Sequence, residues 1–116
     1  MDADLRKMRI ADYENATALW QSLPGMGLSG ADEKIEIEKF LIKNPDSCWV
    51  AEQKGELIGT ILGGNDGRRG YIYHLAVKQS CQTKGIGKAL LQQCLDAFQQ
   101  AALGTMGTAY RAPESA

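Results

Sequence analysis

The sequence contains few of the residues from which metal sites, disulfide frameworks and membrane spans are built. Its 116 residues include one histidine and three cysteines. The cysteines, Cys48, Cys81 and Cys94, are an odd set without the spacing of zinc ligands, so we expect buried, reduced thiols and no metal site. No apolar run approaches the ~20 residues that cross a membrane, and the N-terminal segment lacks the apolar centre of a signal peptide. These absences predict a cytoplasmic protein.

A large net charge is also missing. The chain has 13 Lys and Arg and 14 Asp and Glu, a formal net charge of −1, which argues against a nucleic-acid partner. The basic residues are unevenly distributed, however, because the stretch between Asp66 and Asp96 contains no acid. The basic residues in this stretch are Arg68, Arg69, Lys78, Lys84 and Lys88. Their local positive charge favours a polyanionic ligand, although a solvated helix face gives the same pattern.

One stretch joins a predicted strand to the glycine-containing start of a predicted helix. Residues Tyr71 to Val77 are bulky, β-branched or aromatic except for Ala76, which predicts a strand buried on both faces. After a polar turn comes QTKGIGK, Gln82 to Lys88, and a helix is predicted from about Gly85 to Leu103. The first amides of a helix have no partner within it, and glycines let an anion approach them closely. The pattern predicts a phosphate site, while glycines that only form a turn are the alternative.

Upstream of this stretch, periodicity and turn signals predict the order strand, helix, helix, strand, strand. The predicted elements are a strand at Leu5–Ile10, a helix from the N-cap Asp12 to about Leu23, a helix opened by a Ser29–Asp32 capping box and running to about Lys43, and strands at Cys48–Glu52 and Leu57–Gly64. We therefore expect one α/β domain (α+β in some schemes) over residues 1–103, with a mixed, mainly antiparallel sheet flanked by helices. An irregular tail is expected over residues 104–116.

The motif Q-x-x-G-x-G, formed by Gln82, Gly85 and Gly87 and preceded by the strand residues HLAV, resembles the acetyl-coenzyme A-binding motif of the GNAT acetyltransferase superfamily. The resemblance extends over roughly Arg6 to Leu103 and is strongest from Val50 to Leu91. It implies a GNAT fold. It also implies transfer of an acetyl group from acetyl-coenzyme A to a primary amine of a small molecule or of a protein N-terminus.

The elements that follow the long helix in this family, a further strand, a fourth helix and a final hairpin, have no counterpart in the tail. The sequence therefore resembles a C-terminally truncated member. A relative that binds coenzyme A or forms oligomers without transferring acetyl groups is the alternative. Without a further strand, Tyr71–Val77 is expected to form an open sheet edge, and such edges are prone to pairing. We predict that a second copy of the chain covers this edge in a homodimer.

The resemblance implies two sets of contacts with acetyl-coenzyme A. Backbone groups of Leu75, Ala76 and Val77 bind the pantetheine arm in the manner of a neighbouring strand. The loop after the strand, which begins with the coenzyme-binding position Gln82, holds the pyrophosphate through the amides of Thr83, Lys84, Gly85, Ile86, Gly87 and Lys88. Thr83 stands at a position where glycine is common in the family.

Acyl transfer to an amine needs a polarised thioester carbonyl, a deprotonated amine and a thiolate that can leave. A strand amide near Leu75 is the candidate donor to the carbonyl oxygen. Because histidine titrates near neutral pH, His74 is a candidate general base, and strand alternation places it on the face opposite to Tyr73 and Leu75. Tyr73 and Glu52 are alternative bases, and a histidine with only a structural hydrogen bond is a further interpretation. Met26, in a glycine-rich loop, is a candidate for lining the acceptor site.

Overall fold

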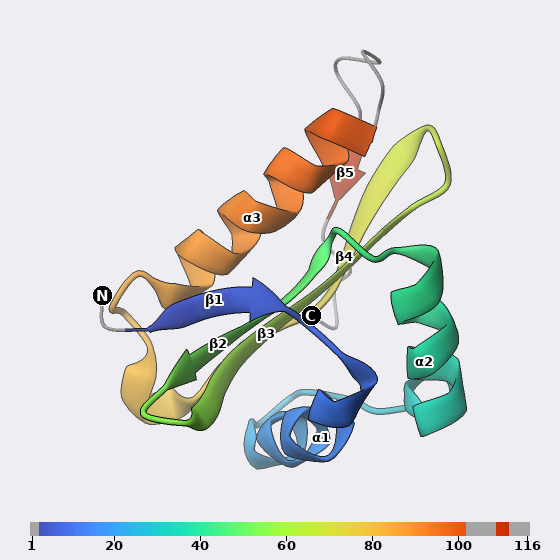
Figure 1. Ribbon diagram of the computed structural model, residues 1–116. Helices are drawn as coiled ribbons and strands as arrows, with labels where there is room; N and C mark the ends of the chain where they lie inside the picture. The colour runs from blue at the N-terminus through green and yellow to red at the C-terminus, as the bar shows by residue number, and fades with distance from the viewer. Residues whose placement is uncertain (1–2, 102–108, 112–116) are drawn as a thin grey trace.

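The computed structural model describes residues 3–101 and 109–111, which form a sheet with helices on both of its faces (Figure 1). The strands are β1 (Asp4–Lys7), β2 (Cys48–Gln53), β3 (Glu56–Asn65), β4 (Arg69–Val77) and β5 (Ala109–Arg111). The helices are α1 (Tyr13–Ser22), α2 (Lys34–Lys43) and α3 (Ile86–Ala101). The predicted order of strands and helices up to α3 is confirmed, and the strands β1 to β4 are antiparallel neighbours.

Helix α3 lies against one face of the sheet, and α1 and α2 lie on the other side (Figure 1). On the α3 side, Ile58 and Ile72 of the sheet pack with Leu90 of the helix. On the opposite side, Trp20 of α1 packs with Leu62 of β3. Each helix buries the apolar stripe that its sequence places at helical spacing. The sheet is therefore enclosed between two apolar layers, and its inner strands contribute to both.

Helix α3 comes close to the sheet because glycines replace side chains where the helix crosses it. A Cβ atom on Gly63 of β3 would collide with the thiol of Cys94 and with the carbonyl oxygen of Ser47. A Cβ atom on Gly70 of β4 would collide with the ring of Phe98. These two glycines are therefore required by packing within the chain, and they fix the distance between α3 and the sheet.

Two predicted element boundaries are wrong because a short 3-10 turn precedes each of the first two helices. The first strand ends at Lys7, and residues Ile10–Asp12 form a turn before α1. The predicted capping box is present, since the Ser29 N–H donates to the Asp32 carboxylate at 2.9 Å. It closes the turn Gly30–Asp32, however, and α2 begins only at Lys34. Asp32 thus ends a turn beside the sheet instead of lying inside a helix.

Strand β4 is less buried than its sequence predicts. Only Gly70, Ile72 and Ala76 are buried, and Tyr73 is 39% exposed. Tyr73 is open to solvent on the side of α1 and α2, and Leu75 and Val77 are only half-buried on the side of α3. The prediction of a strand buried on both faces is therefore wrong.

A β-bulge in β4 changes which side chains share a face. Leu62 pairs with Tyr73 and Thr60 pairs with Ala76, so His74 and Leu75 together oppose the single residue Ile61 of β3. The bulged residue His74 has a positive φ of 48°. Because of the extra residue, both Tyr73 and His74 face α1 and α2, where they contact aromatic rings, and Leu75 faces α3. The predicted opposition of His74 and Leu75 is correct, and that of His74 and Tyr73 is wrong.

The tail that was expected to be irregular contributes strand β5, which pairs in parallel with the beginning of β4. The paired residues are Arg69 with Ala109, Gly70 with Tyr110, and Tyr71 with Arg111. A three-residue strand is too short for alternation to reveal it, so no sequence pattern indicates this element. The rest of the predicted tail, 104–108 and 112–116, lies outside the described residues. Among the residues that the structure describes, none pairs as a strand with the outer edge of β4 from Ile72 to Val77.

The three cysteines are buried and free, so their predicted burial is confirmed. Burial raises the pKa of Cys48 to about 12, and burial together with the nearby Cys48 raises that of Cys94 to about 12. Both thiols stay protonated at neutral pH, so neither is a nucleophile. Within residues 3–101 and 109–111, no three His, Cys, Asp or Glu side chains are grouped so as to hold a metal ion, and no helix is long and apolar enough to cross a membrane.

Candidate functional site

The loop after β4 folds back on the end of that strand. A 3-10 turn at Gln79–Cys81 begins it, and the Gln82 side chain then donates from Nε2 to the carbonyl oxygen of Val77 at 2.9 Å. Thr83 and Gly85 follow with positive φ angles of 66° and 86°. Left-handed residues within a tight turn direct successive N–H groups toward one side, which is the geometry of an anion-binding nest. Gln82 thus anchors the loop through its side chain.

The later amides of this loop, from Thr83 to Lys88, donate to no group among the described residues. The N–H of Ala89 is the first of α3 to donate within the chain, to the carbonyl oxygen of Gly85 at 3.0 Å. For the preceding amides, from Thr83 to Lys88, the described part of the chain supplies no acceptor. Unpartnered N–H groups at a helix start, in a glycine-containing turn, attract a phosphate. The predicted pyrophosphate contacts therefore remain available.

A cavity of about 390 Å³ lies beside these amides. It is lined by Leu75, Val77, Gln82, Thr83, Gly85, Gly87 and Lys88. A Cβ atom on Gly87 would approach only Cγ2 of Val77, at 3.6 Å, which is an ordinary contact. Packing within the chain therefore does not demand a glycine at this position, in contrast to Gly63 and Gly70. The close approach of a ligand to the loop explains a glycine at this position better than packing does.

The outer edge of β4 continues this cavity along the strand. The carbonyl oxygen of Val77 points to the edge, since it accepts the hydrogen bond from Gln82. Backbone groups of a strand alternate in direction, so those of Leu75 point the same way. The residue between them, Ala76, pairs with Thr60 and directs its N–H and C=O toward β3. The strand geometry therefore favours Leu75 and Val77 as contacts for an extended ligand and disfavours the predicted contact with Ala76.

The basic residues that the sequence groups together are separated in space. Arg69 begins β4 and Val77 ends it, which puts about 26 Å between the arginines at the β3–β4 turn and the loop. Lys78 is close to the loop in sequence, but its Nζ forms an ion pair with Glu56. Lys84 and Lys88 are thus the two cations of the stretch that remain at the loop. The predicted field of five basic residues is wrong, because three of them lie elsewhere or are paired.

On the α1–α2 side of the β4 bulge, the ring of His74 is held from three directions. It stacks on Trp20 with ring centroids 4.3 Å apart. Its Nε2 lies 2.6 Å from Oδ1 of Asp32, and its Nδ1 lies 3.2 Å from Sδ of Met26. The carbonyl oxygen of His74 accepts from Thr60 Oγ1 at 2.8 Å. The side chains of His74 and Asp32 are 11% and 13% exposed, so their contact is largely shielded from water.

The two alternative bases have different surroundings. Tyr73 is half-exposed beside the edge of the Phe40 ring, with centroids 5.9 Å apart. It borders a cavity of about 200 Å³, also lined by Phe40, Lys43, Asn44, Gly64, Asn65, Asp66 and Tyr71. Glu52 instead accepts a hydrogen bond from Arg6 at 2.9 Å, and β3 separates its strand from β4. The structure therefore brings Tyr73 and His74 together and separates Glu52 from both.

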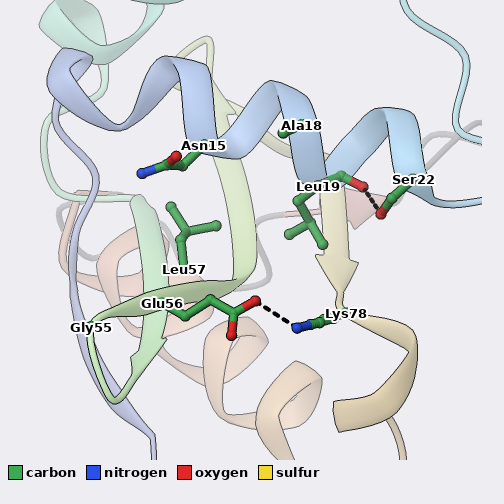
Figure 2. Close-up of a pocket in the computed structure, with 8 residues that line it drawn as sticks. All are labelled: Asn15, Ala18, Leu19, Ser22, Gly55, Glu56, Leu57 and Lys78. Atoms are coloured by element: carbon green, nitrogen blue, oxygen red, sulfur yellow. Dashed lines mark hydrogen bonds and ion pairs between the residues drawn. The ribbon is translucent and has the colours of Figure 1, made fainter.

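A larger cavity, of about 440 Å³, lies between α1 and the β2–β3 turn (Figure 2). It is lined by Asn15, Ala18, Leu19, Ser22, Gly55, Glu56, Leu57 and Lys78. Figure 2 shows that its polar groups are largely paired with each other, since Glu56 binds Lys78 and the Ser22 hydroxyl donates to the carbonyl oxygen of Leu19. None of the predicted site residues lines it. Size alone therefore does not make it the functional site.

Asp32 was missed as a site residue. The sequence identified it only as a capping residue, and it lies 42 positions from His74 along the chain. The sequence also offers Met26 as a candidate for the acceptor site, but no pattern in it predicts the contact with the histidine. Met26, Asp32 and His74 come from a loop, a turn and a strand, and no local sequence pattern links them. Only the folded structure shows that they are in contact.

The chain matches known acetyltransferases in sequence. The model of the acetyltransferase (GNAT) family matches residues 12–112. An acetyltransferase of Photorhabdus laumondii is 39% identical over 88 residues, which cover 76% of this chain and 61% of the relative. An acetyltransferase of Sodalis glossinidius is 36% identical over 90 residues, 78% of this chain and 63% of the relative. The chain therefore spans less than two thirds of the length of these relatives.

The chain also matches solved structures. A diaminobutyrate acetyltransferase of Paenibacillus lautus, in complex with L-2,4-diaminobutyric acid and coenzyme A, gives a TM-score of 0.73 at 22% identity. The match covers 89% of this chain and 61% of that protein. At this level of identity the agreement concerns the fold, and the predicted fold class is confirmed.

Proposed function

The chain belongs to the acetyltransferase (GNAT) family, and we propose that it transfers an acetyl group from acetyl-coenzyme A to a primary amine of a small molecule or of a protein N-terminus. The observation that carries the proposal is the row of amides from Thr83 to Lys88, which have no acceptor in the described part of the chain. A protein of the same fold was solved with coenzyme A and a diamino acid bound, which supports the choice of both substrates.

Acetyl-coenzyme A would lie along the outer edge of β4 and end at the loop. The pyrophosphate would accept from the amides of Thr83 to Lys88, with Lys84 and Lys88 as the nearby cations. The pantetheine arm would bond to the outward backbone groups of Leu75 and Val77, as an added strand does. The thioester would then lie near the bulge, where an amide close to Leu75 is the candidate donor to its carbonyl oxygen.

The acceptor amine would approach from the α1–α2 side of the bulge. There His74 would take a proton from the ammonium group, so that the neutral amine can attack the thioester carbon. A C–N bond forms and the C–S bond breaks, and the second amine proton leaves with the coenzyme A thiolate. Tyr73, on the same face and beside a cavity of about 200 Å³, is the alternative base.

One observation favours a second function, coenzyme A binding or oligomer formation without transfer. Residues Ile72 to Val77 have an unpaired outer edge within the described part of the chain. A second copy can cover this edge by strand pairing. Such a homodimer would use the same backbone groups of β4 as the pantetheine arm. The second copy of the chain and acetyl-coenzyme A would therefore compete for this edge.

Calorimetry with acetyl-coenzyme A tests the phosphate site. In the variant Gly87→Glu, a carboxylate in the loop repels the pyrophosphate, so we expect affinity to fall at least ~10-fold. The control Gln99→Glu adds the same charge at an exposed position of α3, about 18 Å along the helix. Equal affinities of the wild type and Gly87→Glu would refute the phosphate assignment.

Thiol release in the presence of a panel of amines tests the transfer. Amine-dependent release of coenzyme A supports the enzyme, whereas tight binding of acetyl-coenzyme A without release with any amine supports the second function. Sedimentation at several protein concentrations, with and without the coenzyme, then tests the predicted homodimer. A monomer at every concentration would rule it out.

A further inference from the structure

We infer that Asp32 is a positioning residue, which holds the imidazole of His74 with its Nδ1 lone pair available to take the proton of the acceptor amine. This inference rests on the proposed transferase function. Asp32 and His74 come from a turn before α2 and from the bulge of β4, and the chain brings them into contact at 2.6 Å.

Each oxygen of Asp32 has a defined partner. Oδ2 accepts from the N–H of Ser29 at 2.9 Å, and Oδ1 is left for Nε2 of His74. The carbonyl oxygen of Asp32 accepts from the hydroxyl of Tyr13 at 2.7 Å. The carboxylate is therefore fixed by the turn and by α1 before it meets the histidine, and it can determine the orientation of the ring.

The partners of the imidazole select one tautomer. A carboxylate only accepts hydrogen bonds, so the neutral ring must carry its proton on Nε2, toward Asp32. The other nitrogen, Nδ1, lies 3.2 Å from Sδ of Met26, and a thioether is only a weak acceptor, which competes poorly with a carboxylate for the one proton of the neutral ring. In the neutral ring Nδ1 is thus unprotonated, which is the form that a general base needs.

Met26 covers this nitrogen and can uncover it. Its side chain is unbranched and lies between Gly25, with a φ of 82°, and Gly27, and a Cβ atom on either glycine would meet nothing within 4 Å. Rotation of the methionine side chain would expose Nδ1 without moving Trp20, on which the ring stacks. The acceptor amine would take the place of the thioether.

Two further side chains contact the ring, Trp20 on α1 and Met26 in the loop, and both are neutral. Among the described residues, Asp32 is the one charged side chain hydrogen-bonded to the imidazole. When Nδ1 takes the proton of R–NH3⁺, the products are R–NH2 and an imidazolium whose positive charge faces this carboxylate. The imidazolium then releases its proton to solvent.

The state of the ring can be read directly, because the chain has a single histidine. In long-range ¹H–¹⁵N spectra of the ¹⁵N-labelled chain, we expect the neutral imidazole of the wild type to be the Nε2–H tautomer. In Asp32→Asn the carboxylate is lost, and a mixture of tautomers is expected. An Nδ1–H tautomer in the wild type, or the same spectrum in both proteins, would overturn the inference, whether or not any amine is acetylated.

Kinetics give a second measurement if transfer is observed. We expect Asp32→Asn to lower kcat/KM for the amine by ~10–100-fold with KM for acetyl-coenzyme A unchanged. The acidic limb of its pH profile should move to lower pH, because the imidazolium loses the carboxylate that stabilises it. The control Asp46→Asn removes an exposed carboxylate paired with Lys7 and should change neither. An unshifted acidic limb with a uniformly lower rate would indicate a purely structural role and would contradict the inference.

Discussion

The two sides of β4 are built in different ways. On the side of α3, the loop offers the backbone amides of Thr83 to Lys88, one continuous stretch of six residues. On the side of α1 and α2, His74, Asp32 and Met26 come from a strand, a turn and a loop up to 48 positions apart. The first side depends on glycines and main-chain direction, and the second on individual side chains. Substitutions should therefore affect the two sides through different steps of the reaction.

The largest effect that separates the two sides is expected from His74→Gln. The glutamine keeps a polar side chain but cannot act as a base near neutral pH, so kcat should fall by ~10²–10⁴. Binding of acetyl-coenzyme A should stay unchanged, because the loop amides are untouched. Steady-state kinetics with calorimetry check both statements. If kcat of His74→Gln equals that of the wild type, His74 is not the general base, and Tyr73 on the same face becomes the candidate.

A pair of glycine variants should show which glycines serve a ligand and which serve packing. Gly87→Ala places its Cβ 3.6 Å from Val77 Cγ2, so we expect a normally folded protein with ~10-fold weaker binding of acetyl-coenzyme A. Gly63→Ala instead meets Cys94 and the Ser47 carbonyl oxygen, and it should lower the free energy of unfolding by about 1–3 kcal/mol. Urea unfolding and calorimetry measure the two effects. Loss of stability in Gly87→Ala would mean that packing requires this glycine as well.

The sequence predicted the order of strand, loop and helix on the loop side but not the contacts on the opposite side, for a physical reason. The strand, the polar turn and Gly85 with Gly87 follow each other along the chain, so a local pattern describes them. The bulge at His74 depends on its pairing with β3, and it overturns the simple alternation that separated His74 from Tyr73. The contact with Asp32 depends on the tertiary structure, and β5 is too short to produce a pattern.

The ion pair between Arg6 of β1 and Asp12, the residue before α1, should affect stability in a pH-dependent way. Burial opposes ionisation of Asp12, but hydrogen bonds from the Arg6 side chain and the Arg9 N–H hold its pKa below the ordinary value of 3.8. Because the folded pKa is lowered, the stabilisation is present above the ordinary value and is lost as the pH falls through the folded one. Asp12→Asn should therefore cost about 2 kcal/mol at pH 7.

The difference between Asp12→Asn and the wild type should shrink toward zero as the pH falls below 3.8. Urea unfolding at several pH values measures this difference. A constant difference down to pH 2 would contradict the assignment, since the wild-type carboxylate would then not be gaining its stabilisation from ionisation. Acetyl-coenzyme A binding at neutral pH should be unchanged, because the pair lies on the side of the sheet away from the loop.

The smallest effect is expected at Thr83, the β-branched residue of the loop that has a φ of 66°. A β-branched side chain is strained in this region, by about 1–3 kcal/mol, whereas glycine adopts it freely. Glycine also has more conformational freedom to lose on folding, which offsets about 0.5–1 kcal/mol. We therefore expect Thr83→Gly to raise the free energy of unfolding by roughly 1 kcal/mol, with amides that still bind the pyrophosphate. Denaturant unfolding decides the matter: a less stable variant would mean that the threonine side chain, whose hydroxyl donates to the Gln82 carbonyl oxygen, stabilises the turn more than the strain costs.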